Sequence, residues 1–94
     1  MRVVVKNRVT NVGTHRGGVI AIDRKLPAKY RKPIVFHERR EHFLMRKAKP
    51  KCSYRVAHRI ANEEEREKYF KGNNRGWKEY GKVVRRIEKQ NRRG

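Results

Sequence analysis

The strongest constraint on this chain is its excess of positive charge. It carries 28 lysine and arginine residues against 9 aspartate and glutamate residues, which leaves a formal net charge of +19 over 94 residues. Most of the cations therefore have no acidic partner within the chain, and their mutual repulsion destabilises any compact fold. A bound polyanion removes this repulsion and releases counterions into the solvent. The charge predicts nucleic acid as the partner, and it does not separate DNA from RNA.

The apolar content limits the size of the core. Hydrophobic residues make up 35% of the chain, less than in a typical globular domain. Residues 1–94 are therefore expected to form a single basic domain with a thin core, and the last residues of this domain, from about residue 91, are expected to form a flexible basic tail. The single cysteine, Cys52, excludes an internal disulfide and favours a reducing compartment, either the cytoplasm of a cell or host, or a virion. No apolar run is long enough to span a bilayer, so no membrane partner is expected.

The N-terminal residues have the composition of β-strands. Residues 2–10 and 19–23 are rich in β-branched side chains, and three glycines lie in the connecting segment 11–18. Two apolar runs joined by a glycine-containing loop predict a two-stranded antiparallel hairpin. Such a hairpin is marginal on its own in water, so it is expected to pack against the rest of the chain.

The remainder of the chain has helical patterns. Pro33 suits the first residue of a helix, Ser53 suits an N-cap, and Gly72 is typical of a helix end. The predicted helices cover residues 33–47, 54–70 and about 77–90. Together with the hairpin, these two or three helices predict an α+β fold.

Two ionisable residues interrupt the apolar face of the first predicted helix. His37 and Glu41 are four residues apart and share a face with Ile34 and Leu44. The connection to the second helix is short, so the two helices are expected to be antiparallel neighbours. Counting outward from this connection places Glu41 opposite about residue 60, and His37 opposite about residue 64.

Four side chains are therefore expected to converge between the two helices: His37, Glu41, His58 and, as a further candidate, Glu65. Two imidazoles with one or two carboxylates suit Zn²⁺ or another divalent first-row metal. Glu38 follows the first ligand and could act as a general base on a metal-bound water. The same residues could instead form a buried polar network that fixes helix packing, and a chance match is the third alternative.

The same residues carry a resemblance. The segment HERRE at 37–41, followed by Ala57-His58 and Glu65, resembles an HExxE…AH pattern of small uncharacterised phage and microbial proteins. More loosely, the first segment is similar to the zinc-binding helix of HExxH metallopeptidases, in which a second histidine ligand stands where this chain has Glu41. The resemblance covers residues 23–65 at most and implies a metal-binding helix.

The positive charge is greatest at the two ends of the chain. Residues 1–20 hold four cations and no acid, and residues 71–94 hold nine cations and two acids. Trp77 lies among the C-terminal cations and is expected to dock the last helix on the core rather than to stack on bases. The predicted phosphate contacts are Arg2, Lys6, Arg8, Arg16, Lys78, Lys82, Arg85, Arg86, Lys89, Arg92 and Arg93.

These features predict three classes of function. The first is nucleic-acid binding through phosphates without strong sequence readout, in a viral or ribosomal nucleoprotein. The second is a small metal-dependent hydrolase, a nuclease or a peptidase-like enzyme, with a His/Glu/His site. The third is a structural adaptor in a larger assembly. The first two combine in an enzyme whose basic surface holds a nucleic acid near the metal.

Overall fold

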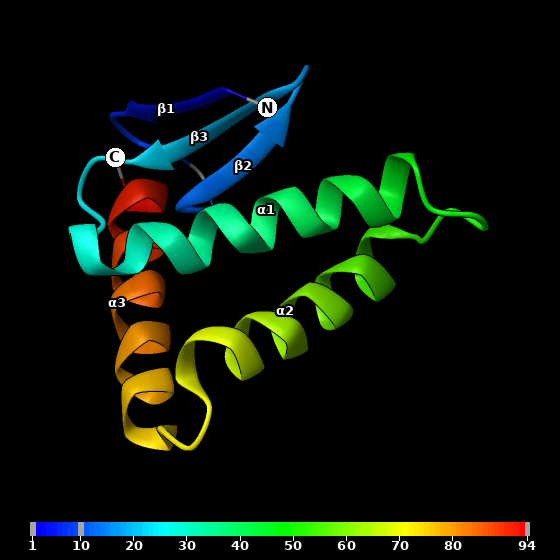
Figure 1. Cartoon of the computed structure of the whole chain (residues 1–94). Helices are drawn as coiled ribbons and strands as arrows, with labels where there is room; N and C mark the ends of the chain where they lie inside the picture. The colour runs from blue at the N-terminus through cyan, green and yellow to red at the C-terminus, as the bar shows by residue number, and fades with distance from the viewer. Residues whose placement is uncertain (1, 10, 94) are drawn as a thin grey trace.

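A three-stranded mixed sheet forms the N-terminal part of the molecule (Figure 1). The computed structural model describes residues 2–9 and 11–93. Strand β3 is central, with β1 parallel to it on one side and β2 antiparallel on the other. The strands are β1 (Arg2–Lys6), β2 (Gly13–Arg16) and β3 (Val19–Asp23).

This sheet confirms the α+β class and corrects the predicted hairpin. The first strand ends at Lys6, and the antiparallel partner of β3 is β2, which lies inside the segment predicted as a loop. The sequence of β2, GTHR, has no β-branched apolar run, so its strand character comes from its pairing with β3. Gly17 and Gly18 form the turn between the two, with φ of 55° and 76°, as a tight hairpin requires. Thr10, at the end of the predicted first strand, lies outside the described residues.

Three α-helices follow the sheet. A short 3-10 helix, η1 (Ala28–Tyr30), leads into α1 (Arg31–Arg46), and α2 (Tyr54–Phe70) runs back beside it (Figure 1). The predicted cap of α2 is confirmed, because the Ser53 hydroxyl accepts a hydrogen bond from the Val56 amide. α1 lies between the sheet and α2, so its residues contact both.

The last helix, α3 (Asn74–Arg93), is longer at both ends than the sequence predicted. At its start, the Asn73 side chain accepts a hydrogen bond from the Gly76 amide. At its end, residues 91–93 continue the helix where a flexible tail was expected. The reason is that the Asn91 side-chain amide donates to the Val9 carbonyl and to the Asp23 carboxylate, each at 2.7 Å.

A small aromatic and aliphatic core joins the sheet to the helices. Trp77 docks as predicted: its ring lies 5.4 Å from that of Phe70 and 5.8 Å from that of Tyr80. The buried residues of this cluster are Val12, Ile20, Ile22, Leu26, Tyr30, Ile34, Phe70, Tyr80 and Ile87.

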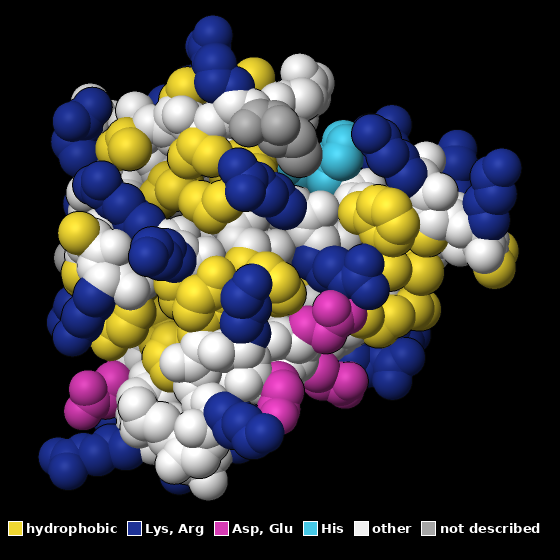
Figure 2. Space-filling model, viewed as in Figure 1, with side chains coloured by type: hydrophobic (Ala, Val, Ile, Leu, Met, Phe, Trp, Pro, Cys, Tyr) yellow, Lys and Arg dark blue, Asp and Glu magenta, His cyan; other side chains and the backbone are white. Residues whose placement is uncertain are grey.

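Lysine and arginine side chains are spread over the visible face of the molecule among hydrophobic and other side chains, while the few acidic side chains lie in its lower half (Figure 2). Within residues 2–9 and 11–93, no helix combines the length and apolar character needed to cross a membrane.

Candidate metal centre and anion-binding cleft

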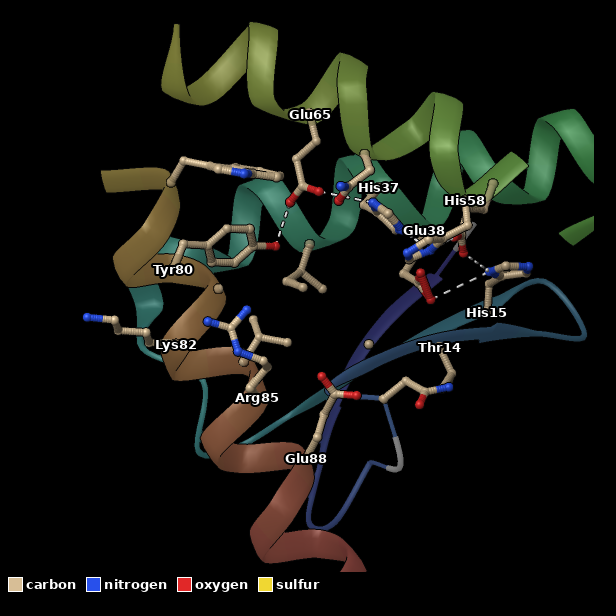
Figure 3. A pocket seen from close by; sticks show the side chains of 18 of the residues that line it. Thr14, His15, His37, Glu38, His58, Glu65, Tyr80, Lys82, Arg85 and Glu88 are labelled. Atoms are coloured by element: carbon tan, nitrogen blue, oxygen red, sulfur yellow. Dashed lines mark hydrogen bonds and ion pairs between the residues drawn. The ribbon is translucent and has the colours of Figure 1, made fainter. Parts of the chain in front are cut away.

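A cleft of about 950 Å³ opens between α1, α2, β2 and α3 (Figure 3). Helices α1 and α2 supply most of its histidine and glutamate side chains, β2 supplies His15, and α3 supplies lysine and arginine from the other side. The cleft therefore contains both a set of metal-ligand types and a set of cations.

The predicted convergence of α1 and α2 is confirmed. His37 Nε2 lies 2.8 Å from Glu41 Oε2, and His58 Nδ1 lies 2.7 Å from the same oxygen. The two histidine nitrogens are 3.2 Å apart. One carboxylate oxygen and two imidazole nitrogens thus form a closed triangle, with each atom facing the other two.

This triangle could hold a divalent metal ion. In a tetrahedral site with bonds of about 2.0–2.2 Å, ligand atoms are about 3.3–3.6 Å apart. The observed separations of 2.7–3.2 Å are shorter, so a modest outward movement of the ligands would seat an ion. His58 can make this movement, because its side chain is 49% exposed.

Glu65 lies on the other side of His37 from the triangle. Its Oε1 accepts a hydrogen bond from His37 Nδ1 at 3.0 Å, and its Oε2 accepts one from the Tyr80 hydroxyl. The prediction of Glu65 as a ligand in this triangle is therefore corrected, since sequence spacing does not reveal which ring nitrogen a carboxylate faces. A carboxylate on the second nitrogen fixes the orientation of a ligating histidine.

The electrostatics of the triangle favour positive charge. Burial alone would lower the pKa of His37, but hydrogen bonds and charge interactions with Glu41 and Glu65 raise it to about 10. Burial likewise opposes ionisation of Glu41, but its hydrogen bonds with His37 and His58 lower its pKa. A proton is thus held where a divalent ion would bind, and metal binding would displace it.

A second group of ligand types adjoins the triangle. His15 Nδ1 lies 3.6 Å from Glu38 Oε1 and 3.9 Å from Glu41 Oε1, and these three atoms could also hold an ion. Burial and the neighbouring charge of Glu41 raise the pKa of Glu38 to about 8. His15 was not predicted as a site residue, because its position depends on how β2 packs against α1.

The cations of α3 form the other side of the cleft. Lys78, Lys82 and Arg85 line it at helical spacing, and Glu88 is the acid that follows them. The Arg85 guanidinium lies against α3 near Gly81 on the cleft side of the helix, whereas Lys82 extends away from the cleft (Figure 3).

The other predicted phosphate contacts are exposed but lie outside the cleft lining. Arg8 donates to the carbonyl of Asn91, so it links the two basic ends of the chain. The remaining members of this group are Arg2, Lys6, Arg16, Arg86, Lys89, Arg92 and Arg93.

No protein-family model, curated protein or solved structure matches this chain. The chemistry of the cleft is therefore the basis for assigning a function.

Proposed function

We propose that this protein is a metal-dependent hydrolase that cleaves the phosphodiester bonds of nucleic acid. The observation that carries the proposal is the meeting of His37 Nε2, His58 Nδ1 and Glu41 Oε2 at one point in an open cleft. Two imidazoles and a carboxylate are a ligand set of catalytic zinc sites and leave coordination positions for water and substrate. The lone Cys52 is consistent with action in a reducing cytoplasm.

The exposure of His58 favours a metal site over a packing network. A histidine that only fixes helix packing gains most when it is buried with its partners, yet the His58 side chain is 49% exposed at the cleft. The Tyr54 ring stacks on it, with centroids 5.5 Å apart. This stacking orients the imidazole while leaving one edge open to a ligand.

The two sides of the cleft suit a phosphodiester substrate. A bound Zn²⁺ or other first-row ion would polarise a phosphoryl oxygen and lower the pKa of water. His37, His58 and Glu41 would hold that ion, and Arg85 from α3 would pair with a phosphate. The net charge of +19 would attract a long polyanion to the cleft. These cations favour a nuclease over a peptidase.

The first test is metal dependence. We expect the purified, tag-free protein to bind Zn²⁺ or Mn²⁺ stoichiometrically and to cleave an oligonucleotide only when the ion is present. His58→Ala removes one ligand of the triangle, so it should bind one equivalent fewer ion than the wild type and should not cleave the oligonucleotide, as measured by elemental analysis after dialysis and by gel assay.

The matched control is Arg59→Ala, because Arg59 is an exposed neighbour on α2 that does not line the cleft. It should retain both properties. A wild-type chain that binds no divalent ion, or a His58→Ala variant with undiminished metal binding, would overturn the proposal.

Nucleic-acid binding without cleavage is the second candidate, favoured by the exposed cations that line the cleft, such as Arg85, and by those outside it. If about six to ten phosphates are neutralised, affinity should fall by about 10³–10⁵ between 50 and 200 mM salt. Arg85→Gln should reduce the slope of log K against log salt by about 0.7–0.9, because one phosphate contact is lost.

Fluorescence anisotropy with a labelled oligonucleotide measures this slope. The control is Arg39→Gln, since Arg39 is exposed on α1 and does not line the cleft. Affinity that does not change with salt would contradict phosphate binding, and equal slopes for Arg85→Gln and wild type would exclude Arg85 from it.

A further inference from the structure

We infer that the cleft binds a second divalent metal ion, coordinated by His15, Glu38 and the second oxygen of Glu41. This inference rests on the proposed hydrolase function and deepens it, because it makes Glu41 the bridge of a two-metal centre. The three side chains that would hold this ion lie on β2 and α1.

The two oxygens of Glu41 face different groups. Oε2 contacts His37 and His58 at 2.8 and 2.7 Å, while Oε1 faces His15 Nδ1 at 3.9 Å. A carboxylate that presents one oxygen to each of two ligand sets is suited to bridge two ions. Two-metal hydrolytic sites hold their ions about 3.5–4 Å apart, a separation that one bridging carboxylate can span.

His15 supplies the independent evidence. Its Nδ1 is buried and, among the described residues, has no hydrogen-bond partner, although it points at two carboxylates (Figure 3). A buried polar atom without a partner is costly and rare in folded proteins. An ion between His15, Glu38 and Glu41 would satisfy this nitrogen and neutralise two adjacent carboxylates.

The separations fit an ion better than direct hydrogen bonds. His15 Nδ1 lies 3.6 and 3.9 Å from the two carboxylates, beyond the usual range of about 2.7–3.2 Å for a hydrogen bond. Ligand atoms on one metal with bonds of about 2.0–2.2 Å lie about 3.3–3.6 Å apart in tetrahedral geometry. The distances from His15 Nδ1 to the two carboxylates are therefore already close to those between ligand atoms of one bound ion.

Close packing of β2 on α1 fixes this arrangement. A Cβ on Gly13 would lie 2.6 Å from Ile34 Cγ2 and 3.4 Å from Glu38 Cγ, so only glycine allows the strand to approach this closely. His15 follows two residues later on the same face of β2. The His42 ring packs edge-on against it, with centroids 5.6 Å apart, and holds its orientation.

The second ion changes the role of Glu38 and specifies the reaction. Glu38 becomes a metal ligand rather than a general base. In the hydrolysis, a water oxygen forms a bond to phosphorus, the bond to the leaving ester oxygen breaks, and one water proton ends on that oxygen. Two ions stabilise the attacking and the leaving oxygens together, which suits a phosphodiester.

The test is the number of ions bound. We expect the metal-free wild-type chain to bind two equivalents of Mn²⁺ in equilibrium dialysis, and Glu38→Gln and His15→Asn to bind one each. The control His42→Phe keeps an aromatic ring against His15 and should still bind two. Circular dichroism verifies that each variant is folded.

The outcomes separate this inference from the proposed function. One equivalent on the wild-type chain overturns the second site and leaves the hydrolase proposal standing, whereas no binding overturns both. Glu38→Gln with two equivalents and no hydrolysis also overturns it and returns Glu38 to the role of base. Electron paramagnetic resonance of the Mn²⁺-loaded wild type needs no variant: a spin-coupled pair supports the bridge, and isolated ions at full loading contradict it.

Discussion

Replacing Glu41 with glutamine is expected to remove metal binding from the whole cleft and to reduce hydrolysis to the rate without protein. Glu41 is the residue shared by both ligand groups, so its loss leaves two histidines on one side and one histidine with Glu38 on the other. Each remaining pair of ligands lacks the negatively charged carboxylate that Glu41 supplies to both sites. Glutamine has nearly the same shape, so the buried space at position 41 stays filled.

The measurement is metal content after dialysis, together with the initial rate of oligonucleotide cleavage. Glu64→Gln is the matched control: Glu64 lies on α2 and pairs with Arg40 at 2.9 Å, outside the cleft lining. It should behave as wild type. A Glu41→Gln variant that keeps its full metal complement would remove Glu41 from both sites.

The first metal triangle was predictable because helices have a fixed period. His37 and Glu41 share a face at a spacing of four residues, and the short connection sets α1 antiparallel to α2. That count placed Glu41 near residue 60, and the structure has it against His58. Local rules were sufficient here, since only one tertiary contact had to be assumed.

The second ligand group was not predictable from the same rules. His15 lies in a segment that was read as a loop, and its approach to Glu38 depends on Gly13 packing against Ile34. Strand pairing is set by partners far along the chain, as the parallel pairing of β1 with β3 also shows. The role of Glu65 was missed for another reason. The spacing of residues along two helices predicts that Glu65 lies near His37, but it does not predict which nitrogen of the His37 ring the carboxylate contacts.

The largest expected effect on folding is at Asp23, the fully buried last residue of β3. Its carboxylate accepts hydrogen bonds from the amides of Val9 and Lys25, each at 2.9 Å, and from the Asn91 side chain at 2.7 Å. It therefore connects the sheet, the following loop and the end of α3. We expect Asp23→Ala to lower the free energy of unfolding by about 3 kcal/mol, because hydrogen bonds to a charged group contribute about 1.5–3 kcal/mol each and the Val9 amide would be left buried without its acceptor.

The loss of stability caused by Asp23→Ala should depend on pH in a defined direction. Burial alone would raise the pKa of Asp23, but hydrogen bonds from Lys25, Asn91 and Val9 hold it below its ordinary value of 3.8. Because the pKa of Asp23 is lower in the folded state than in the unfolded state, its carboxylate stabilises the fold fully at pH values above the unfolded-state pKa. This contribution to stability is lost as the pH falls through the pKa that Asp23 has in the folded state. The stability gap between wild type and Asp23→Ala should therefore narrow in acid.

Urea denaturation at several pH values measures this gap. Gln90→Ala is the matched control, because Gln90 is an exposed neighbour of Asn91 on α3 and should change stability by less than about 0.5 kcal/mol. Asp23→Asn keeps the shape without the charge, so it should lose the acid-dependent part of the contribution. A gap below about 1 kcal/mol for Asp23→Ala, smaller than one hydrogen bond to a charged group, would show that Asp23 does not connect these elements. In that case the ordered end of α3 depends on its apolar contacts alone, chiefly those of the buried Ile87.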